Sequence, residues 1–341
     1  MLFGVFDHLD SSGAPLDRFF EDRLRLLERY DAAGFYCYHL AEHHGTPLGM
    51  GSSPSVFMAA AAQRTKRLKL GPMVYCLPLY HPLRVFEEIC MLDQMSGGRL
   101  QLGVGRGISP IELAYYGVAR EDSPEIYRET FELLMTALAT EVGKDLTFEG
   151  NHFSVADFPI VIEAIQKPHP PLWYGIGVPD SAIWAAQNAV NIMCNQSTAR
   201  ARAVTDRYKA EWAAAGKAAE ALPKMGLTRH IVVADSEAEA VSAGARAYAR
   251  WRSSFMYLWD RHGISPINVS YPESFEAMQE AGLAIAGTVG TVRDTVSRQV
   301  EEAGINYFLG RFAFGDLSFE ESARSVELFA QEVAPVFAAA A

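Results

Sequence analysis

The chain has 341 residues, 49% of them hydrophobic, and a formal net charge of −11. The length supplies a large core, and the acidity excludes a nucleic-acid surface because phosphate binding needs clustered Lys and Arg. No segment has the length of a membrane span or the pattern of a signal peptide, so we expect a cytoplasmic protein that does not contact membranes.

Eight short apolar runs predict buried parallel strands. They cover residues 2–6, 35–39, 68–74, 100–104, 172–177, 190–194, 227–234 and 305–310. Amphipathic patterns between and after them predict helices over residues 17–33, 82–95, 123–140, 180–188, 198–215, 236–251, 291–303 and 318–333. This alternation is typical of an α/β protein with a (β/α)8 TIM barrel, here a single domain over residues 1–341.

The chain is longer than a bare barrel of about 250 residues, and two regions account for the excess. Residues 146–155 alternate around Gly150 and Asn151, which predicts a hairpin. Residues 252–286 lack periodicity and contain Gly263 and Pro266. We interpret this second region as an insertion that forms an active-site lid, with disordered decoration as the alternative.

Chemically active side chains follow several predicted strands, at the face where barrel enzymes build their sites. Glu42-His43-His44 follows the second strand and supplies imidazoles that exchange protons near neutral pH. The alternative is a structural histidine pair. His81 follows the third strand beside a proline, where a helix-capping role is the commoner one.

Glycine-rich turns follow the fourth and fifth strands. Gly103-Val104-Gly105-Arg106-Gly107 offers a guanidinium suited to phosphate, or else a tight turn with a solvated arginine. The run from Gly175 to Ser181 leads into a helix, and it predicts either a phosphate seat or ordinary capping by Asp180 or Ser181.

The four cysteines are widely separated and lie in apolar sequence, which predicts buried free thiols; they are Cys37, Cys76, Cys90 and Cys194. No HExxH, GxSxG or dinucleotide-binding fingerprint occurs. The sequence therefore predicts neither a metal site nor a nicotinamide site.

These motifs, in this order, resemble the bacterial luciferase-like superfamily of flavin-dependent monooxygenases. The resemblance extends over nearly the whole chain; besides the motifs above it includes Leu92-Asp93-Gln94-Met95-Ser96-Gly97-Gly98-Arg99, Trp184-Ala185-Ala186-Gln187 and Val289-Gly290-Thr291. It implies a barrel that binds FMN, reduced by a separate flavin reductase. The reduced flavin would react with O2 to give a peroxyflavin that oxygenates a small organic substrate, and the apolar composition favours an apolar one.

The resemblance also implies roles for individual residues. His43 would be the catalytic residue, as a general base or hydrogen-bond partner, with His44 supporting it. Arg106, Val178 and Ser181 would bind the flavin phosphate. Met73 and Val74 would lie against the isoalloxazine ring, where relatives often carry a strained peptide bond, and Asn195 would be a further flavin contact.

Two positions depart from luciferase itself. Gly105 stands where luciferase has a reactive cysteine, so the resemblance does not extend to light emission. Gly177-Val178 replaces a Glu-Ser pair, which leaves Ser181 to carry more of the phosphate binding.

Two other functions fit the same fold, namely hydride transfer with the deazaflavin F420 and a non-catalytic flavin-binding partner subunit. We expect a homodimer, since family members often pair through helices on one side of the barrel. The helix over residues 82–95 is a candidate contact, although its apolar residues Val85, Phe86, Ile89 and Leu92 would equally cover the barrel.

Overall fold

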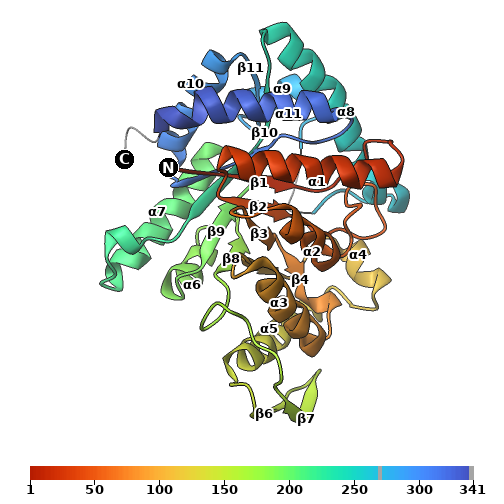
Figure 1. Ribbon diagram of the computed structural model, residues 1–341, viewed down its shortest axis with the longest axis vertical. Coiled ribbons are helices and arrows are strands. Elements are labelled where there is room, and N and C mark those ends of the chain that lie inside the picture. Colours follow the sequence, from red (N-terminus) through yellow and green to blue (C-terminus); the bar gives the residue numbers. More distant parts are fainter. Residues whose placement is uncertain (268–270, 338–341) are drawn as a thin grey trace.

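Parallel strands form a barrel that helices surround, as Figure 1 shows for this computed structural model, which describes residues 1–267 and 271–337. The hydrogen-bonded order is β3-β2-β1-β12-β10-β9-β8-β5-β4, and a bridge between Leu70 and Leu100 joins the β3 and β5 segments. The strands are β1 (Leu2–Asp7), β2 (Cys37–Leu40), β3 (Lys69–Pro72), β4 (Tyr75–Cys76), β5 (Leu102–Gly105), β8 (Leu172–Gly175), β9 (Asn191–Cys194), β10 (Met225–Val233) and β12 (Tyr307–Arg311). The predicted (β/α)8 barrel is confirmed.

Helices cover the outside of this barrel. They are α1 (Leu16–Ala33), α2 (Pro54–Arg64), α3 (Pro82–Ser96), α4 (Pro110–Tyr115), α5 (Ser123–Ala139), α6 (Ser181–Gln187), α7 (Thr198–Ala214), α8 (Glu237–His262), α9 (Phe275–Glu280), α10 (Val289–Ala303) and α11 (Phe319–Leu328). Local signals set several boundaries. Gly34 ends α1 with φ 81°, and Nδ1 of His81 caps α3 by accepting from the Leu83 N–H at 3.3 Å.

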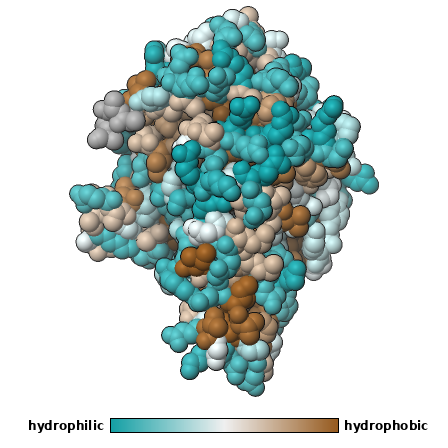
Figure 2. All heavy atoms as spheres, in the orientation of Figure 1, coloured by the Kyte–Doolittle hydropathy of each residue, from teal (hydrophilic) through white to brown (hydrophobic). Residues whose placement is uncertain are grey.

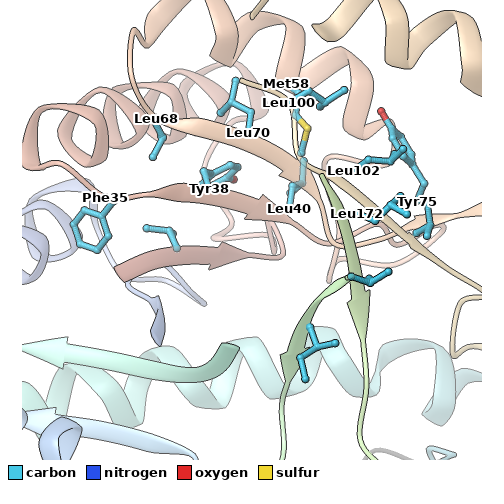
Figure 3. Packing of buried hydrophobic residues seen from close by; sticks show 14 of the residues in the cluster. Phe35, Tyr38, Leu40, Met58, Leu68, Leu70, Tyr75, Leu100, Leu102 and Leu172 are labelled. Atoms are coloured by element: carbon cyan, nitrogen blue, oxygen red, sulfur yellow. The ribbon is translucent and has the colours of Figure 1, made fainter. Parts of the chain in front are cut away.

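Side chains alternate between the barrel interior and the helices. Tyr38, Leu40 and Leu70 point out of β2 and β3 into the helix layer, where they meet Met58 of α2 (Figure 3). His39, between the first two, points inward, and its ring packs 4.6 Å from Trp173. The strands are therefore buried on both faces, which explains their continuous apolar runs.

Glycine makes room for large residues inside the barrel. A Cβ at Gly4 of β1 would lie 1.7 Å from the Tyr307 hydroxyl oxygen. That hydroxyl lies 3.2 Å from Nε2 of His39, so the space that Gly4 leaves is used for a buried polar contact.

The expectation of an irregular segment over residues 252–286 is wrong for much of its length. Helix α8 continues to His262, α9 follows at Phe275–Glu280, and β11 (Ala284–Gly287) pairs in parallel with the C-terminal half of β10. Phe255, Leu258 and Trp259 continue the buried stripe that includes Trp251, so the helical period extends past the predicted end. Residues 268–270 of this segment lie outside the described residues.

The other addition to the barrel is the antiparallel hairpin of β6 (Asp145–Glu149) and β7 (Ser154–Pro159), at the lower end of Figure 1. The predicted hairpin is thus confirmed. In Figure 2 the viewed face is mostly hydrophilic, with apolar residues gathered near this lower end. Among the helices of residues 1–267 and 271–337, none combines the length and apolarity needed to span a membrane.

The apolar residues of α3 face the barrel. Val85, Phe86, Ile89 and Leu92 are all buried within the chain. Of the two roles that the sequence left open for them, the structure supports barrel covering. The four cysteines are buried free thiols, as predicted.

Candidate active site

A cavity opens at the C-terminal ends of the strands. Its apolar walls include Phe6, Met73, Met193 and Phe255. Polar side chains from four strand ends and from helix α4 converge on it, namely His8, His43, Asn195 and Arg311 from the strand ends and Glu112 from the helix. An apolar pocket with a few convergent polar groups is the usual form of a small-molecule site.

His43 lies in this cavity, directly after β2, and Glu112 of α4 holds it. Nδ1 of His43 is 3.2 Å from Oε1 of Glu112. An ionised carboxylate only accepts hydrogen bonds, so Nδ1 carries the proton of this bond and Nε2 is left for a ligand. On the other side, the ring of His8 stacks on His43 at 5.7 Å between centroids.

The Glu112 carboxylate changes the acidity of His43. Burial alone would lower the pKa of the imidazole, but the charge and hydrogen bond of Glu112 outweigh it and raise the pKa above 6.5. In turn, burial would raise the pKa of Glu112, and His43 together with the His44 N–H lowers it overall. This environment favours the protonated form of His43, whose Nε2 can donate a hydrogen bond.

His44 does not line the cavity, and neighbouring groups engage both of its ring nitrogens. Nε2 lies 2.7 Å from Oε1 of Glu42, and Nδ1 lies 2.8 Å from the Tyr116 hydroxyl. The His44 main-chain N–H also donates to Oε2 of Glu112 at 2.9 Å. His44 therefore helps to fix the carboxylate that holds His43.

Glu42 extends this network to the next strand. Its Oε2 accepts from the N–H of Cys76 at 3.0 Å, while its Oε1 faces His44. In the motif Glu42-His43-His44, the first two residues line the cavity, and the hydrogen bonds of Glu42 and His44 hold the surrounding framework in place.

Met73, Val74 and Asn195, which the family resemblance implies as flavin contacts, also line the cavity. The Met73–Val74 peptide bond is cis and lies between β3 and β4. Asn195 follows β9, and its amide is oriented by two neighbours: Nδ2 donates to the Tyr271 hydroxyl, and Oδ1 accepts from Thr228 Oγ1 at 2.8 Å.

Arg106, Val178 and Ser181 do not line the cavity. Arg106 is exposed after β5, and Val178 is exposed in the loop between β8 and α6. Because β5 and β8 are neighbours in the sheet, both loops lie at the same part of the barrel rim. Asp180 precedes α6 and makes no capping hydrogen bond with its side chain.

Several polar residues of the cavity were not predicted from the sequence, among them Glu112, His8 and Arg311. Glu112 lies on a six-residue helix that was not predicted, His8 follows the first strand, and Arg311 ends β12. The sequence offered one indication for His8 and Arg311, namely that each lies at the end of a predicted strand. Among the residues that the structure describes, no group of three or more His, Cys, Asp or Glu is arranged to hold a metal ion.

Comparison with known proteins identifies close relatives. The chain is 44% identical over 322 residues to the uncharacterized protein y4wF of Sinorhizobium fredii, covering 94% of this chain and 93% of the relative. It is 30% identical over 328 residues to 4-hydroxyprotoasukamycin monooxygenase of Streptomyces nodosus subsp. asukaensis, covering 92% and 86%.

Solved structures share the fold over nearly the full chain. The monooxygenase RslO1 of Streptomyces bottropensis matches with a TM-score of 0.87 at 25% identity, covering 99% of this chain and all of the other. The oxygenating constituent of 3,6-diketocamphane monooxygenase of Pseudomonas putida, solved with FMN, has a TM-score of 0.80 at 20% identity and 98% coverage of both. An F420-dependent tetrahydromethanopterin reductase of Methanopyrus kandleri has a TM-score of 0.70 at 19% identity, covering 98% and 99%.

The family model for luciferase-like monooxygenases matches residues 1–307, which include β1 through the start of β12 and the residues around the cavity up to Tyr271. With this match and the relatives above, the chain belongs to the luciferase-like monooxygenase family.

Proposed function

We propose that the protein is the oxygenase component of a two-component flavin-dependent monooxygenase. It would use reduced FMN from a separate flavin reductase, together with O2, to oxygenate a small and largely apolar organic substrate. The observation that carries the proposal is His43, which faces an apolar cavity while Glu112 raises its pKa. The FMN complex of the diketocamphane enzyme supports the choice of cofactor.

The residues around the cavity fit a flavin. Gly107 lines the cavity with φ +82°, a left-handed conformation that glycine adopts without strain, and it leaves this part of the wall without a side chain. Met73 and Val74 would contact the isoalloxazine ring, with Asn195 as a further contact. Arg106, Val178 and Ser181 would hold the phosphate at the rim, outside the cavity.

Bound there, reduced flavin would supply the electrons that activate O2. The part of His43 is to hold a proton at Nε2 and donate a hydrogen bond to a reacting oxygen. The part of His44 and Glu42 is to keep Glu112 and the loop after β2 in place. The apolar side chains of Phe255 and Leu48 line the cavity and would limit water there, which would protect a reaction that stray protons divert.

The C-terminal part of α8 and the segment to Ala286 would act as the lid. Phe255 and Tyr271 of this segment line the cavity, and the carbonyl oxygen of Ser254 accepts from Thr46 Oγ1 at 3.2 Å. We further propose a homodimer.

Anaerobic titration with reduced FMN and with reduced F420, followed by mixing with O2 and substrate candidates, tests the proposal. We expect selective binding of reduced FMN and O2 uptake that is linked to substrate. His43→Ala should lower that turnover by about 10²- to 10⁴-fold while the Kd for reduced FMN stays within about twofold. His152→Ala, in the connection between β6 and β7, is the matched control.

Other results would redirect the assignment. Selective binding of F420 without O2 uptake would place the protein with the hydride-transfer enzymes of this fold. Binding of neither cofactor would indicate the non-catalytic partner subunit. Undiminished substrate oxygenation by His43→Ala would remove His43 as the catalytic residue.

A further inference from the structure

A buried arginine at the end of the last barrel strand has no role in the site described so far. Arg311 lines the cavity although only 2% of its surface is exposed. Its guanidinium lies over the Phe6 ring, 4.8 Å from the centroid, and Nη1 is 3.4 Å from Nδ1 of His230. Its Nε is buried and has no hydrogen-bond partner among the described residues.

Within the part of the chain that the structure describes, no carboxylate forms an ion pair with Arg311. Tyr271 and the more distant Asp10 and Asp7 favour its charge, but burial outweighs them and lowers the pKa of Arg311. The two carboxylates near the cavity, Glu42 and Glu112, face His44 and His43 instead. His230 is a neutral neighbour, because burial and the two nearby arginines hold its pKa well below 6.5. A buried and unpaired charge is costly, so a ligand that supplies an anion would be strongly favoured.

We propose that Arg311 recognises a carboxylate on an otherwise apolar substrate. A guanidinium binds a carboxylate through two parallel hydrogen bonds, and Phe6, Met193 and Phe255 of the cavity walls suit an aromatic or alicyclic body. This inference rests on the proposed function, because it names the substrate class of the same cavity.

The position of Arg311 favours substrate over the flavin as the source of the anion. Arg106 and Ser181, the proposed phosphate ligands, follow β5 and β8. Arg311 ends β12, which three strands in the sheet order separate from β5, so it lies across the barrel mouth from that rim. A flavin anchored at the rim with its ring against Met73–Val74 leaves the Arg311 side for a second molecule.

Benzoate and benzamide are probes that share a ring and differ in charge. Their binding to the full chain is measured by calorimetry without flavin and again with reduced FMN under anaerobic conditions. We expect benzoate to bind at least about tenfold more tightly than benzamide in either condition, and Arg311→Met to remove that difference. The Kd for reduced FMN should change less than twofold, so a failure of FMN binding is recognised separately.

Thermal unfolding distinguishes recognition from a structural role. Arg311→Met removes a buried charge that forms no ion pair and whose burial outweighs the favourable charges around it, so its Tm without ligand should equal or exceed that of the parent protein. Arg229→Met is the matched control, because Arg229 is also buried, forms no ion pair among the described residues and has a buried Nη2 without a hydrogen-bond partner, but it does not line the cavity. It should keep the preference for benzoate.

Three results would overturn the proposal. The first is equal binding of benzoate and benzamide by the parent protein. The second is a benzoate preference that survives in Arg311→Met. The third is a tenfold or larger loss of reduced-FMN affinity in Arg311→Met, which would assign the anion to the flavin.

Discussion

At the scale of single residues, one carboxylate sets the chemistry of the cavity. Glu112 contacts His43 through one oxygen and the His44 N–H through the other, so it fixes both the orientation and the charge of the imidazole. A lone histidine in an apolar cavity would be neutral near pH 7, whereas this one has a raised pKa. The raised pKa of His43 can be tested by titration without knowledge of the natural substrate.

Glu112→Gln should lower the pKa of His43, because the amide keeps a hydrogen-bond acceptor but removes the charge. If protonated His43 is the active form, kcat/KM falls as the pH rises through the pKa of His43. The falling limb of the pH profile should therefore move to lower pH in the variant, and NMR titration of the His43 ring should show the same shift. An unchanged profile would contradict a donor role for His43.

The same shift affects folding. A histidine whose pKa is higher in the folded chain contributes stability that is complete below its unfolded pKa, about 6.5, and that is lost as the pH rises through the folded value. For the His43–Glu112 pair, this contribution should be smaller in Glu112→Gln. The difference in free energy of unfolding between the two proteins should shrink from pH 6 to pH 9, as measured by urea titration.

Arg106 belongs to the same scale, as a proposed phosphate ligand on an exposed loop. Arg106→Ala should weaken binding of FMN by about 10- to 100-fold and leave riboflavin binding nearly unchanged, since only FMN carries the phosphate. Fluorescence titration with both flavins measures this, and exposed Arg120→Ala serves as the control. Equal losses for the two flavins would remove the phosphate assignment.

At the scale of elements, the extension of α8 determines how the cavity is enclosed. Leu258 and Trp259 pack with Ile111 of α4 in a separate small apolar cluster, and Nε2 of His262 lies 2.9 Å from the Tyr115 hydroxyl. The end of α8 is therefore attached to the short helix that carries Glu112. A substitution that loosens the packing of one of these helices should therefore also loosen the other.

Leu258→Ala should loosen this attachment. Removing a buried leucine side chain costs about 2–5 kcal/mol in free energy of unfolding. We expect faster hydrogen exchange in α8 after Trp251 and in α4, together with more O2 consumption that is not linked to substrate oxidation. Tyr257→Ala removes a more exposed side chain on the same helix. This control should change neither the hydrogen exchange nor the O2 consumption. Exchange confined to α8 alone would argue against coupling of the two helices.

At the scale of the whole molecule, buried polar groups join the first and last strands of the barrel. Asp7 of β1 accepts from Arg23 of α1 at 3.1 Å and from the Tyr38 hydroxyl at 2.9 Å. Oδ2 of Asp10 accepts from the Gly315 N–H at 2.6 Å, which connects the loops after β1 and β12. Burial raises the pKa of Asp10 to about 7, in spite of the opposing charge of Arg23.

The raised pKa of Asp10 predicts a stability that falls with pH. An acid that binds its proton more tightly in the folded chain stabilises fully below its unfolded pKa, near 4, and this contribution is lost as the pH rises towards 7. The slope is about 1.4 kcal/mol per pH unit for one proton. Asp10→Asn should flatten the decrease between pH 5 and 7, whereas exposed Asp17→Asn should not. Urea unfolding at several pH values measures the slopes, and parallel curves for Asp10→Asn and the parent protein would contradict the shift.

The sequence alone determined the barrel, because strands buried on both faces leave continuous apolar runs and their helices leave a 3.6-residue period. The place of His43 after a strand indicated it as a site residue, since the ends of parallel strands meet at one face. The family resemblance, and not the pattern of strands, indicated Met73, Val74 and Asn195. The sequence did not indicate how far α8 extends or that α4 exists. Those elements are stabilised by packing between distant segments, such as Trp259 on Ile111, which local periodicity does not record.

Only the tertiary structure decided which charges are paired. Glu112 forms its hydrogen bond with His43 across 69 positions of the sequence. Arg311 lies 268 positions beyond His43 in the same cavity, and no carboxylate among the described residues forms an ion pair with it. Acidity and ligand preference depend on distances of a few ångströms and on the exclusion of water. Both quantities arise only when the chain has closed its barrel, so composition and spacing along the sequence could not supply them.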